Sequence, residues 1–565
     1  MDELKKTILS ALAEVGLSVT DLEKPPKSDM GDFALPCFTF AKEQKKSPAQ
    51  IAQELAEKLN EKLPQSISVK PLGPYLNFII EQSKVAGPIV QKILSEKDKY
   101  GFKPDTDKVI LIESPGPNTN KPLHLGHLRN MLLGHSLSRI LSTQGSTVKI
   151  VNILNDRGVH ICKSMLAYER FGEGKKPEDS GVKSDHFVGD FYVKYAQEAE
   201  NNPALEDDVQ EMLVKWENED PEVRALWKTM NTWAIEGFHE TYAVLNFVID
   251  KEYAESDIYL DGREVILKGL NDGIFEKDEK GAVVVTFEDT QLGKKVLLRA
   301  NGTAVYITQD IVLAKKRYED YTFDEMIYVV GNEQEYHFRV LFEIFKKFNW
   351  PFAGKCSHFS YGMVELPDGK MKSRQGNVID TDTLIDDVSL LAQEEVRKRY
   401  KDLSEEEIID RSRKIALASI RFFFLKYDPL RNFVFNPKES LSFEGETGPY
   451  VLYAYARMCS IFRKHGKADI SGNLDLLDTE QDKSLGVVLS EYPAVLTEAA
   501  KQYKPSLLCT YLITLAGAFN AYYRDNPILK ADDNVRDARL MLLQAVQHVL
   551  RSGLELLGID VLEQM

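Results

Sequence analysis

The sequence predicts an α/β protein: a Rossmann-type parallel sheet with a mostly helical insertion, a small α+β domain before it and an α-helical bundle after it. Three observations lead to this fold. A strand, a loop, a helix and a second strand follow one another from residue 108, strand patterns cease near residue 388, and 565 residues suffice for two to four domains of ordinary size. We therefore expect domains over residues 1–107, 108–388 and 389–565, with the insertion at about 160–270.

The first domain is expected to be a small α+β unit. Ser47-Pro48 is a typical helix start, and the apolar residues that follow recur every four positions, at Ile51, Leu55, Leu59 and Leu63. Residues 75–80 then form a short strand-like stretch.

The central domain opens with the apolar stretch VILIE, which precedes the loop SPGPNTNKP and an amphipathic helix over residues 125–141. A strand over residues 147–153 completes a β-loop-α-β unit, the building block of a parallel sheet. After the acidic, helical insertion, AVYIT (304–308) predicts a strand, followed by a helix to about residue 318 and a strand over 326–331. This alternation indicates one α/β domain that is interrupted by the insertion.

The third region shows helical periods and ends in a strongly apolar helix, with Leu540, Leu543, Val546, Leu550, Leu554 and Leu557. Between Arg411 and Lys467, eleven basic residues stand against four acids, with aromatic residues interleaved among them. Such a mixture can contact phosphates and stacked bases. The alternative is a bundle whose aromatics form the core and whose basic residues are solvated.

The formal charge of −16 argues against a protein that coats nucleic acid nonspecifically. The acidity is concentrated, because residues 198–222 contain ten acids and one base, Lys215. A selective nucleic-acid partner therefore remains open.

The five cysteines are scattered and form no C-x-x-C pair, so we expect neither a disulfide framework nor a structural zinc site. The N-terminus lacks a signal peptide, and no 18 apolar residues run together. These features predict a cytoplasmic chain with reduced thiols, no membrane partner and no resident metal.

The first motif is His124-Leu125-Gly126-His127, where the loop after the first strand turns into a helix. We expect unpaired backbone N–H groups and the positive end of the helix dipole there, which suits a triphosphate. Gly126 allows a ligand to approach the backbone, and two imidazoles three positions apart share one face. Taken alone, such a His pair is more often incidental, so its context decides.

The second motif is KMKSRQGN, a basic loop over residues 370–377 that follows a strand near residues 358–364. Its positive charge could stabilise the equatorial oxygens during nucleotidyl transfer. An isolated loop of this kind would be interpreted as a solvated turn. The order and spacing of the two motifs on one interrupted α/β domain favour the catalytic interpretation.

Longer stretches of the chain resemble the class I aminoacyl-tRNA synthetases, whose HIGH and KMSKS signatures are similar to HLGH and KMKSR, and within that class the arginyl-tRNA synthetases. These stretches are PNTNKPLHLGHLRN, NDRG, YITQD, GNEQEYH, KMKSRQGNVI and ETGPYVLYAYAR. The resemblance covers essentially the whole chain. It implies that ATP activates L-arginine to arginyl-adenylate, which passes arginine to the terminal adenosine of tRNA(Arg).

The resemblance also implies an arginine pocket. Asn118 and Gln334 would hold the α-amino and carboxylate end of arginine, with His127 beside them. Glu113 would line the same pocket.

Tyr306 and Asp310 would receive the guanidinium of arginine. The residue types support this in part, because two positions four apart at a helix start share a face, and a guanidinium prefers a carboxylate with an aromatic or hydroxyl wall. The alternative for Asp310 is an acid that stabilises the helix dipole.

ATP, with Mg²⁺, and the departing pyrophosphate would be bound by the two motifs through His124, Gly126, His127, Lys370, Met371, Lys372 and Ser373. The second motif departs from KMSKS, because Ser373 stands where the second lysine is usual, with Lys372 before it and Arg374 after it. In relatives that lack that lysine, a lysine just before the first motif resembles a substitute, and Lys121 occupies that place. We expect Lys121 and Lys370 to be the catalytic cations, assisted by Arg374 and by the two histidines.

The bundle is expected to read the tRNA stem and anticodon loop, with contacts from Arg457, Arg463, Tyr450 and Tyr453, while residues 1–107 contact the tRNA elbow. We expect a monomer. Two alternatives remain: a HIGH-type transferase for another amino acid, and a noncatalytic tRNA-binding relative.

Overall fold

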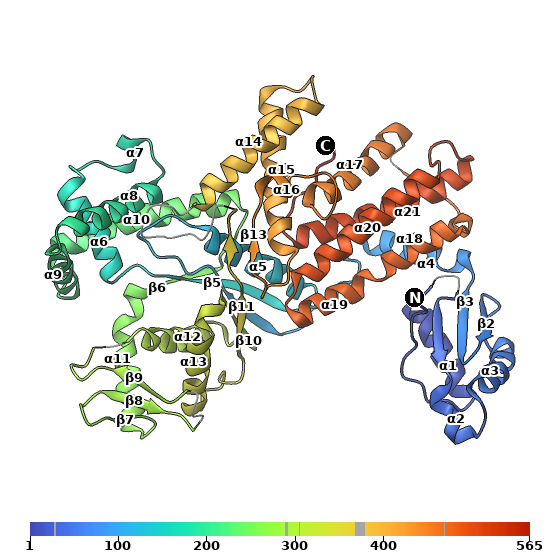
Figure 1. Ribbon diagram of the computed structural model, residues 1–565, viewed down its shortest axis with the longest axis horizontal. Helices are drawn as coiled ribbons and strands as arrows, with labels where there is room; N and C mark the ends of the chain where they lie inside the picture. Colours follow the sequence, from blue (N-terminus) through green and yellow to red (C-terminus); the bar gives the residue numbers. More distant parts are fainter. Residues whose placement is uncertain (28–29, 289–291, 304, 368–378, 468) are drawn as a thin grey trace.

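A five-stranded parallel sheet lies at the centre of the molecule (Figure 1). The computed structural model describes residues 1–565 except 28–29, 289–291, 304, 368–378 and 468. The strands follow the order β11-β10-β4-β5-β6, and every neighbouring pair is parallel. Their bounds are β4 Val109–Glu113, β5 Thr147–Leu154, β6 Lys251–Ala254, β10 Glu325–Gly331 and β11 Cys356–Tyr361. The predicted Rossmann-type fold is confirmed.

Both faces of this sheet are covered, which explains why β4 is apolar at consecutive positions. Ile110 and Ile112 pack in the core on the side of helix α5 (Leu125–Ser142), whereas Leu111 packs on the opposite side. The helices of that opposite side are α11 (Glu255–Asn271), α12 (Ile307–Tyr321) and α13 (Glu335–Lys347). The sheet is therefore a rigid support for the loops at its strand ends.

A group of helices separates β5 from β6. They are α6 Val159–Phe171, α7 Pro177–Ser180, α8 Ser184–Asn201, α9 Leu205–Glu217 and α10 Pro221–Val244. The segment is helical as expected, but the range 160–270 also contains β6, which pairs with β5 as an edge strand of the main sheet. A strand of four residues has too few alternations to be recognised in such a segment.

A second excursion follows α11 and consists of a small antiparallel sheet in the order β7-β8-β9. Its strands are β7 Glu276–Lys277, β8 Val283–Thr286 and β9 Lys294–Leu298. The predicted strand over 304–308 is wrong, because α12 begins at Ile307; residue 304 lies outside the described residues. The β-branched residues favour a strand locally, but Ile307 and Thr308 are buried in the first helical turn, so packing overrides propensity.

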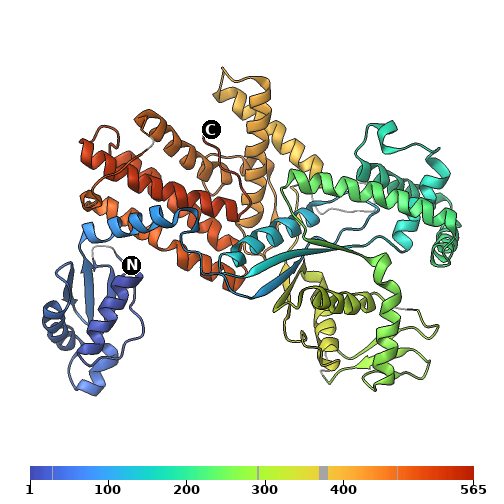
Figure 2. The same cartoon turned by 180° about the vertical axis from the view of Figure 1, so that it is seen from behind.

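The N-terminal unit is a three-stranded antiparallel sheet, order β1-β3-β2, with helices against it. Its elements are α1 Asp2–Glu14, β1 Phe33–Pro36, α2 Phe38–Gln44, α3 Pro48–Lys62, β2 Ile67–Leu72 and β3 Tyr75–Ile80. The predicted helix start is present, since Ser47 Oγ accepts from the Gln50 N–H at 3.3 Å. Figure 2 shows this unit at the end of the molecule away from the insertion.

The C-terminal part is a helical bundle. Its helices are α14 Thr381–Arg399, α15 Glu405–Leu425, α16 Pro437–Ser440, α17 Gly448–His465, α18 Glu480–Ser490, α19 Tyr492–Gln502, α20 Pro505–Asp525 and α21 Asp533–Leu556. Helix α4 (Ala86–Glu96) precedes the sheet in the chain but packs against α18 and α21. A two-stranded ribbon, β12 (Val364–Glu365) with β13 (Phe433–Val434), joins the sheet region to the bundle. Across the described part of the chain, none of the helices has the length and apolar character needed to cross a membrane.

Candidate active site

The two loops that form the site leave the carboxyl ends of β4 and β10, which are neighbours in the sheet. The strand order reverses between them, because β5 and β6 lie on one side of β4 while β10 and β11 lie on the other. Such a reversal opens a crevice in which ligands bind in open α/β sheets. Residues 114–124 follow β4 and residues 332–337 follow β10. The stretches PNTNKPLHLGH and GNEQEYH therefore lie at this crevice.

His124 and His127 bind the backbone of their own helix. His124 is the N-cap residue of α5, and its Nδ1 accepts a hydrogen bond from the Gly126 N–H at 3.1 Å. The N–H of His124 donates to Nδ1 of His127, also at 3.1 Å, and the two rings stack with centroids 3.9 Å apart. The expectation of unpaired backbone N–H groups is therefore wrong for residues 124 and 126, because the imidazoles themselves act as caps.

Acceptance at Nδ1 sets the tautomer of each ring, so the single proton of the neutral imidazole sits on Nε2. Burial lowers the pKa of His124 to about 4 and lowers the pKa of His127 well below its usual value, and the charge of Lys121 contributes to both shifts. Both rings are neutral near pH 7 as a result. Each offers one Nε2–H donor, and such donors can bind phosphoryl oxygens.

Gly126 is required by the packing of the histidine ring. A Cβ atom at this position would lie 2.9 Å from Cε1 and 3.0 Å from Nδ1 of His124. Any larger residue would therefore displace the ring that caps the helix.

Lys121 lies three residues before His124, at the same turn. It is half-buried, and burial lowers the pKa of its ammonium group. Within the part of the chain that the structure describes, its side chain has no hydrogen-bond or ion-pair partner. A desolvated, unpaired ammonium beside two neutral donors suits a polyanionic ligand.

The chain returns to this turn directly after residues 368–378. The Thr381 N–H donates to the Leu123 carbonyl at 2.7 Å, and Asp380 forms an antiparallel bridge with His124. The predicted residues of the second motif, Lys370, Met371, Lys372, Ser373 and Arg374, lie outside the described residues.

The predicted guanidinium residues, Tyr306 and Asp310, lie at the start of α12, where Tyr306 is the N-cap residue and Asp310 is in the first turn. Asp310 Oδ2 is 2.7 Å from Nε2 of His337, and the His337 ring lies 5.6 Å from the Tyr306 ring. The Tyr306 side chain is 61% exposed, so it is available to a ligand. The negative charge of Asp310 is the main cause that raises the pKa of Tyr306; burial of the hydroxyl and the charges of Glu113 and Glu255 add to it, so the hydroxyl stays protonated.

Two further carboxylates surround this group. Glu113, at the end of β4, accepts a hydrogen bond from the fully buried guanidinium of Arg317, yet burial raises its pKa. Glu255, the first residue of α11, accepts from Gln309 Nε2 at 2.7 Å, and burial raises its pKa to about 7. Arg317 pairs with Glu113, and Arg157 lies 3.7 Å from Glu255, so Asp310 is the carboxylate best placed to receive a cationic ligand.

Sequence reasoning missed Glu255, His337 and Arg317 in this pocket. His337 stood in the quoted GNEQEYH stretch, three residues after Gln334, so helical spacing could have indicated it. Glu255 follows β6, the strand that the sequence did not reveal. Arg317 gave no signal that separates it from a surface base.

Asn118 and Gln334, expected at the amino and carboxylate end of arginine, lie on the two loops of the crevice. Asn118 is half-buried and bridges in parallel to Asn155, which extends the edge of β5. Gln334 is exposed at the end of the turn after β10. They therefore flank the crevice from opposite loops.

The predicted tRNA residues separate into two groups. Arg457 lies over the ring of Tyr453 at 4.7 Å and near Tyr523 at 5.7 Å, and it donates to Asn520 Oδ1 at 2.7 Å. Asn520 in turn donates to the Tyr450 hydroxyl at 3.3 Å. This group on α17 and α20 has two partly exposed aromatic rings beside an arginine.

Arg463 lies elsewhere on α17. Six residues turn a helix by about 240°, so Arg463 faces a different direction from Arg457. It donates to the Glu563 carbonyl at 3.1 Å.

Most other aromatics of the stretch 411–467 are core residues, as the alternative interpretation held. Tyr455 and Phe422 are 0% exposed, whereas Tyr453 is 36% exposed. One base of the stretch, Arg421, is also buried at 4% exposure. Only part of this stretch can therefore contact a nucleic acid.

Known protein families and relatives match nearly the whole chain. The family described as "tRNA synthetases class I (R), catalytic domain" matches residues 89–437, "DALR anticodon binding domain" matches 451–565, and "Arginyl tRNA synthetase N terminal domain" matches 2–80. The arginine--tRNA ligase of Treponema denticola is 46% identical over 96% of this chain and 95% of its own length. That of Treponema pallidum is 43% identical over 96% and 94%. The solved arginyl-tRNA synthetase of Thermus thermophilus superposes with a TM-score of 0.80 over 100% of both chains at 28% identity.

Proposed function

The chain belongs to the class I arginyl-tRNA synthetases. We propose that its two small substrates bind at different places in the crevice, with ATP at the His124 turn and arginine beside Asp310. The chain is an arginine–tRNA ligase, which activates L-arginine with ATP to arginyl-adenylate and transfers the arginine to the terminal adenosine of tRNA(Arg). The observation that supports this placement is that a pair of neutral donors follows β4, while the Asp310 carboxylate and its partner His337 lie at α12 and after β10.

We propose that the Nε2–H groups of His124 and His127 bind phosphoryl oxygens of ATP, which enters with Mg²⁺ as substrate. Lys121 balances the charge that develops as pyrophosphate leaves, together with Lys370 and Arg374. The arginine carboxylate attacks the α-phosphate in line, so catalysis consists of positioning and electrostatic stabilisation. No covalent enzyme intermediate is required.

The arginine guanidinium is placed between Asp310 and the hydroxyl of Tyr306, inside the field of Glu113 and Glu255. Asn118 and Gln334 hold the other end of arginine from the two loops of the crevice. This arrangement favours arginine over neutral side chains because Glu113 and Glu255 already lie beside Arg317 and Arg157, whereas Asp310 gains a guanidinium partner from the substrate.

For tRNA(Arg), we propose that residues 389–565 read the stem and anticodon loop and that residues 1–107 contact the elbow. The exposed Tyr453 ring and Arg457 support this for α17, since an aromatic ring with a guanidinium can stack on a base and pair with a phosphate. We also propose that the chain acts in the cytoplasm, in keeping with five free thiols, and as a monomer.

The test is ATP–pyrophosphate exchange over a panel of amino acids, with and without total tRNA. Exchange with arginine and with no other amino acid of the panel supports the assignment. Robust exchange with another amino acid would favour a transferase of different specificity. An unchanged charging rate in Lys370→Ala would remove Lys370 from the proposed catalytic cations. Equal exchange with and without tRNA would show that activation does not depend on bound tRNA.

A further inference from the structure

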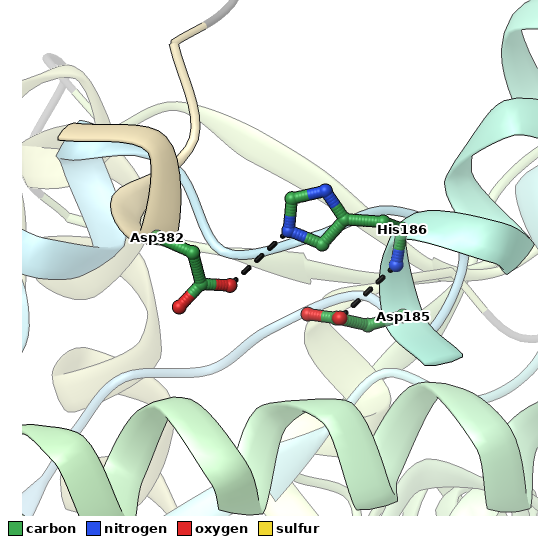
Figure 3. Close-up of side chains that lie close together, drawn as sticks. All are labelled: Asp185, His186 and Asp382. Atoms are coloured by element: carbon green, nitrogen blue, oxygen red, sulfur yellow. Dashed lines mark hydrogen bonds and ion pairs between the residues drawn. The ribbon is translucent and has the colours of Figure 1, made fainter. Parts of the chain in front are cut away.

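A side-chain cluster around Asp382 joins the helical insertion to the first turn of α14 (Figure 3). We call Lys183, Asp185, His186, Thr241 and Asp382 the Asp382 cluster. His186 Nε2 lies 3.1 Å from Asp382 Oδ2, and the backbone N–H of His186 donates to Asp185 Oδ1 at 3.0 Å. Three of these residues lie at the start of α8, Thr241 lies on α10, and Asp382 lies in the first turn of α14.

The Asp382 carboxylate uses both of its oxygens in this cluster. Lys183 Nζ donates to Oδ2 at 2.7 Å, and Thr241 Oγ1 donates to Oδ1 at 2.9 Å. Burial alone would raise the pKa of Asp382, but the bonds from His186, Lys183 and Thr241 lower it to about 2. The carboxylate is therefore ionised and held from two helices of the insertion.

The spacing of Asp185, His186 and Asp382 would also suit a metal ion. However, the Lys183 ammonium already lies 2.7 Å from Asp382 and 3.4 Å from Asp185. It occupies the place of a cation and lies within ion-pair distance of both carboxylates. The cluster is thus a complete ion-pair network that links two parts of the protein.

The segment that carries Asp382 contacts residues 121–127 directly, the turn that is proposed to bind ATP and that we call the ATP turn. Its neighbour Thr381 donates its N–H to the Leu123 carbonyl, and Asp380 bridges to His124. Asp380 also caps α14, accepting from the Thr383 N–H at 2.8 Å. Any displacement of the first turn of α14 would therefore move the backbone on which His124 and Lys121 are placed.

Helix α8 also contacts the ATP turn directly. A Cβ atom on Gly189 would lie 2.7 Å from Cδ of Pro122 and 3.5 Å from Cα of Lys121, so α8 packs closely on the backbone of the turn. The insertion thus supports the turn both through Asp382 and by direct contact.

We propose that Lys183 and His186 are positioning residues for ATP: they hold Asp382, and through residues 379–382 they hold the Lys121–His127 turn in the geometry that binds the triphosphate. This inference rests on the proposed role of that turn in ATP binding. It gives the insertion a part in the activation step, although none of its residues need contact ATP.

The test is pyrophosphate exchange with ATP varied at saturating arginine and tRNA. His186→Leu and Lys183→Met should each raise the KM for ATP about tenfold, or ~1.4 kcal/mol, and leave the KM for arginine within about twofold. His186→Gln, whose amide can still donate to Asp382, and Lys183→Arg should restore most of the ATP affinity. The His186 variants keep the test valid if Lys183→Met does not fold, because Lys183 also neutralises the buried Asp185.

Lys163→Met is the matched control. Lys163 makes an ion pair of the same length, 2.7 Å to Glu206, within the same insertion, and neither of the two side chains has a described hydrogen bond or ion pair with residues 121–127 or 379–382. It should lower thermal stability without changing the KM for ATP. Cluster variants that lose stability while the KM for ATP stays within twofold of the native value would overturn the proposal. Lys121→Ala distinguishes failure of the positioning role from failure of the ATP assignment. If Lys121→Ala also leaves the KM for ATP unchanged, the assignment of ATP to this turn is wrong. If Lys121→Ala raises the KM for ATP and the cluster variants do not, only the positioning role fails.

Discussion

Replacing Asp310 by asparagine should weaken arginine binding and leave ATP binding unchanged. The substitution preserves the shape of the side chain, and the amide oxygen of the new side chain can still accept from His337, whose Nε2 lies 2.7 Å from Asp310 Oδ2. What is lost is the negative charge opposite the guanidinium. The new amide also turns a donor toward a group that has only donors.

The magnitude follows from the surroundings of Asp310. A hydrogen bond to a charged group contributes roughly 1.5–3 kcal/mol. The Asp310 side chain is 25% exposed, which reduces the loss, and Glu113 and Glu255 remain to attract the cation. The unfavourable contact between donors adds to the loss, so we expect ~2–3 kcal/mol, which is an increase of about 30- to 150-fold in the KM for arginine.

The assay is pyrophosphate exchange with arginine varied at saturating ATP and tRNA, with citrulline as the neutral isostere of arginine. The variant should lose much of its preference for arginine over citrulline as an inhibitor. Asp320→Asn is the matched control, because Asp320 lies on the same helix, is 29% exposed and pairs with Lys251 at 2.7 Å, outside the pocket. It should leave the KM for arginine unchanged.

An arginine KM within threefold of the native value in Asp310→Asn would refute the reasoning, since the guanidinium would then be bound elsewhere. So would an equal effect in Asp320→Asn, which would show that the stability of α12 and not the charge was decisive.

Three further predictions follow from the same geometry. Gly126→Ala should raise the KM for ATP about tenfold by displacing the His124 ring. Thermal stability should change little, because the lost cap costs roughly 1 kcal/mol and alanine favours a helix over glycine by about the same amount. An unchanged KM for ATP would show that the position of the His124 ring does not matter for ATP binding. Burial raises the pKa of Glu255 to about 7, so this carboxyl gains its negative charge as pH rises from 6 to 8. The affinity for arginine, measured by calorimetry, should therefore increase over that range, and Glu255→Gln should abolish the increase. A pH profile that is the same in Glu255→Gln as in the native protein would exclude Glu255 from the pocket. Arg457→Glu should weaken tRNA binding and reduce the salt dependence by about one phosphate contact while sparing arginine affinity, and unchanged filter binding would move the tRNA face away from Tyr453.

Some features of the site could be predicted because they depend on short stretches of chain. His124 and His127 are three positions apart at a helix start, so their common face follows from helical geometry, and the stacked rings confirm it. Tyr306 and Asp310 meet for the same reason. The capping role of the imidazoles was missed, because histidine is not among the usual cap residues.

The β-type stretch AVYIT shows where local propensity fails. Its β-branched residues favour a strand, yet burial of Ile307 and Thr308 against the core beneath the sheet places them in a helix. The exposed Tyr453 and the buried Tyr455, two positions apart on α17, were equally indistinguishable in sequence. Which residues are buried depends on the helices that pack against this one.

The sequence by itself determined most strands of the parallel sheet, the helical bundle and the helix start that carries the first motif, since each depends on periodicity or capping within a few residues. Only the tertiary structure decided the partners of the buried charges. Arg317 pairs with Glu113 across 204 residues, and His186 pairs with Asp382 across 196. Contacts at such separations depend on how the strands are ordered in the sheet and on where the insertion folds back, and no local pattern records either.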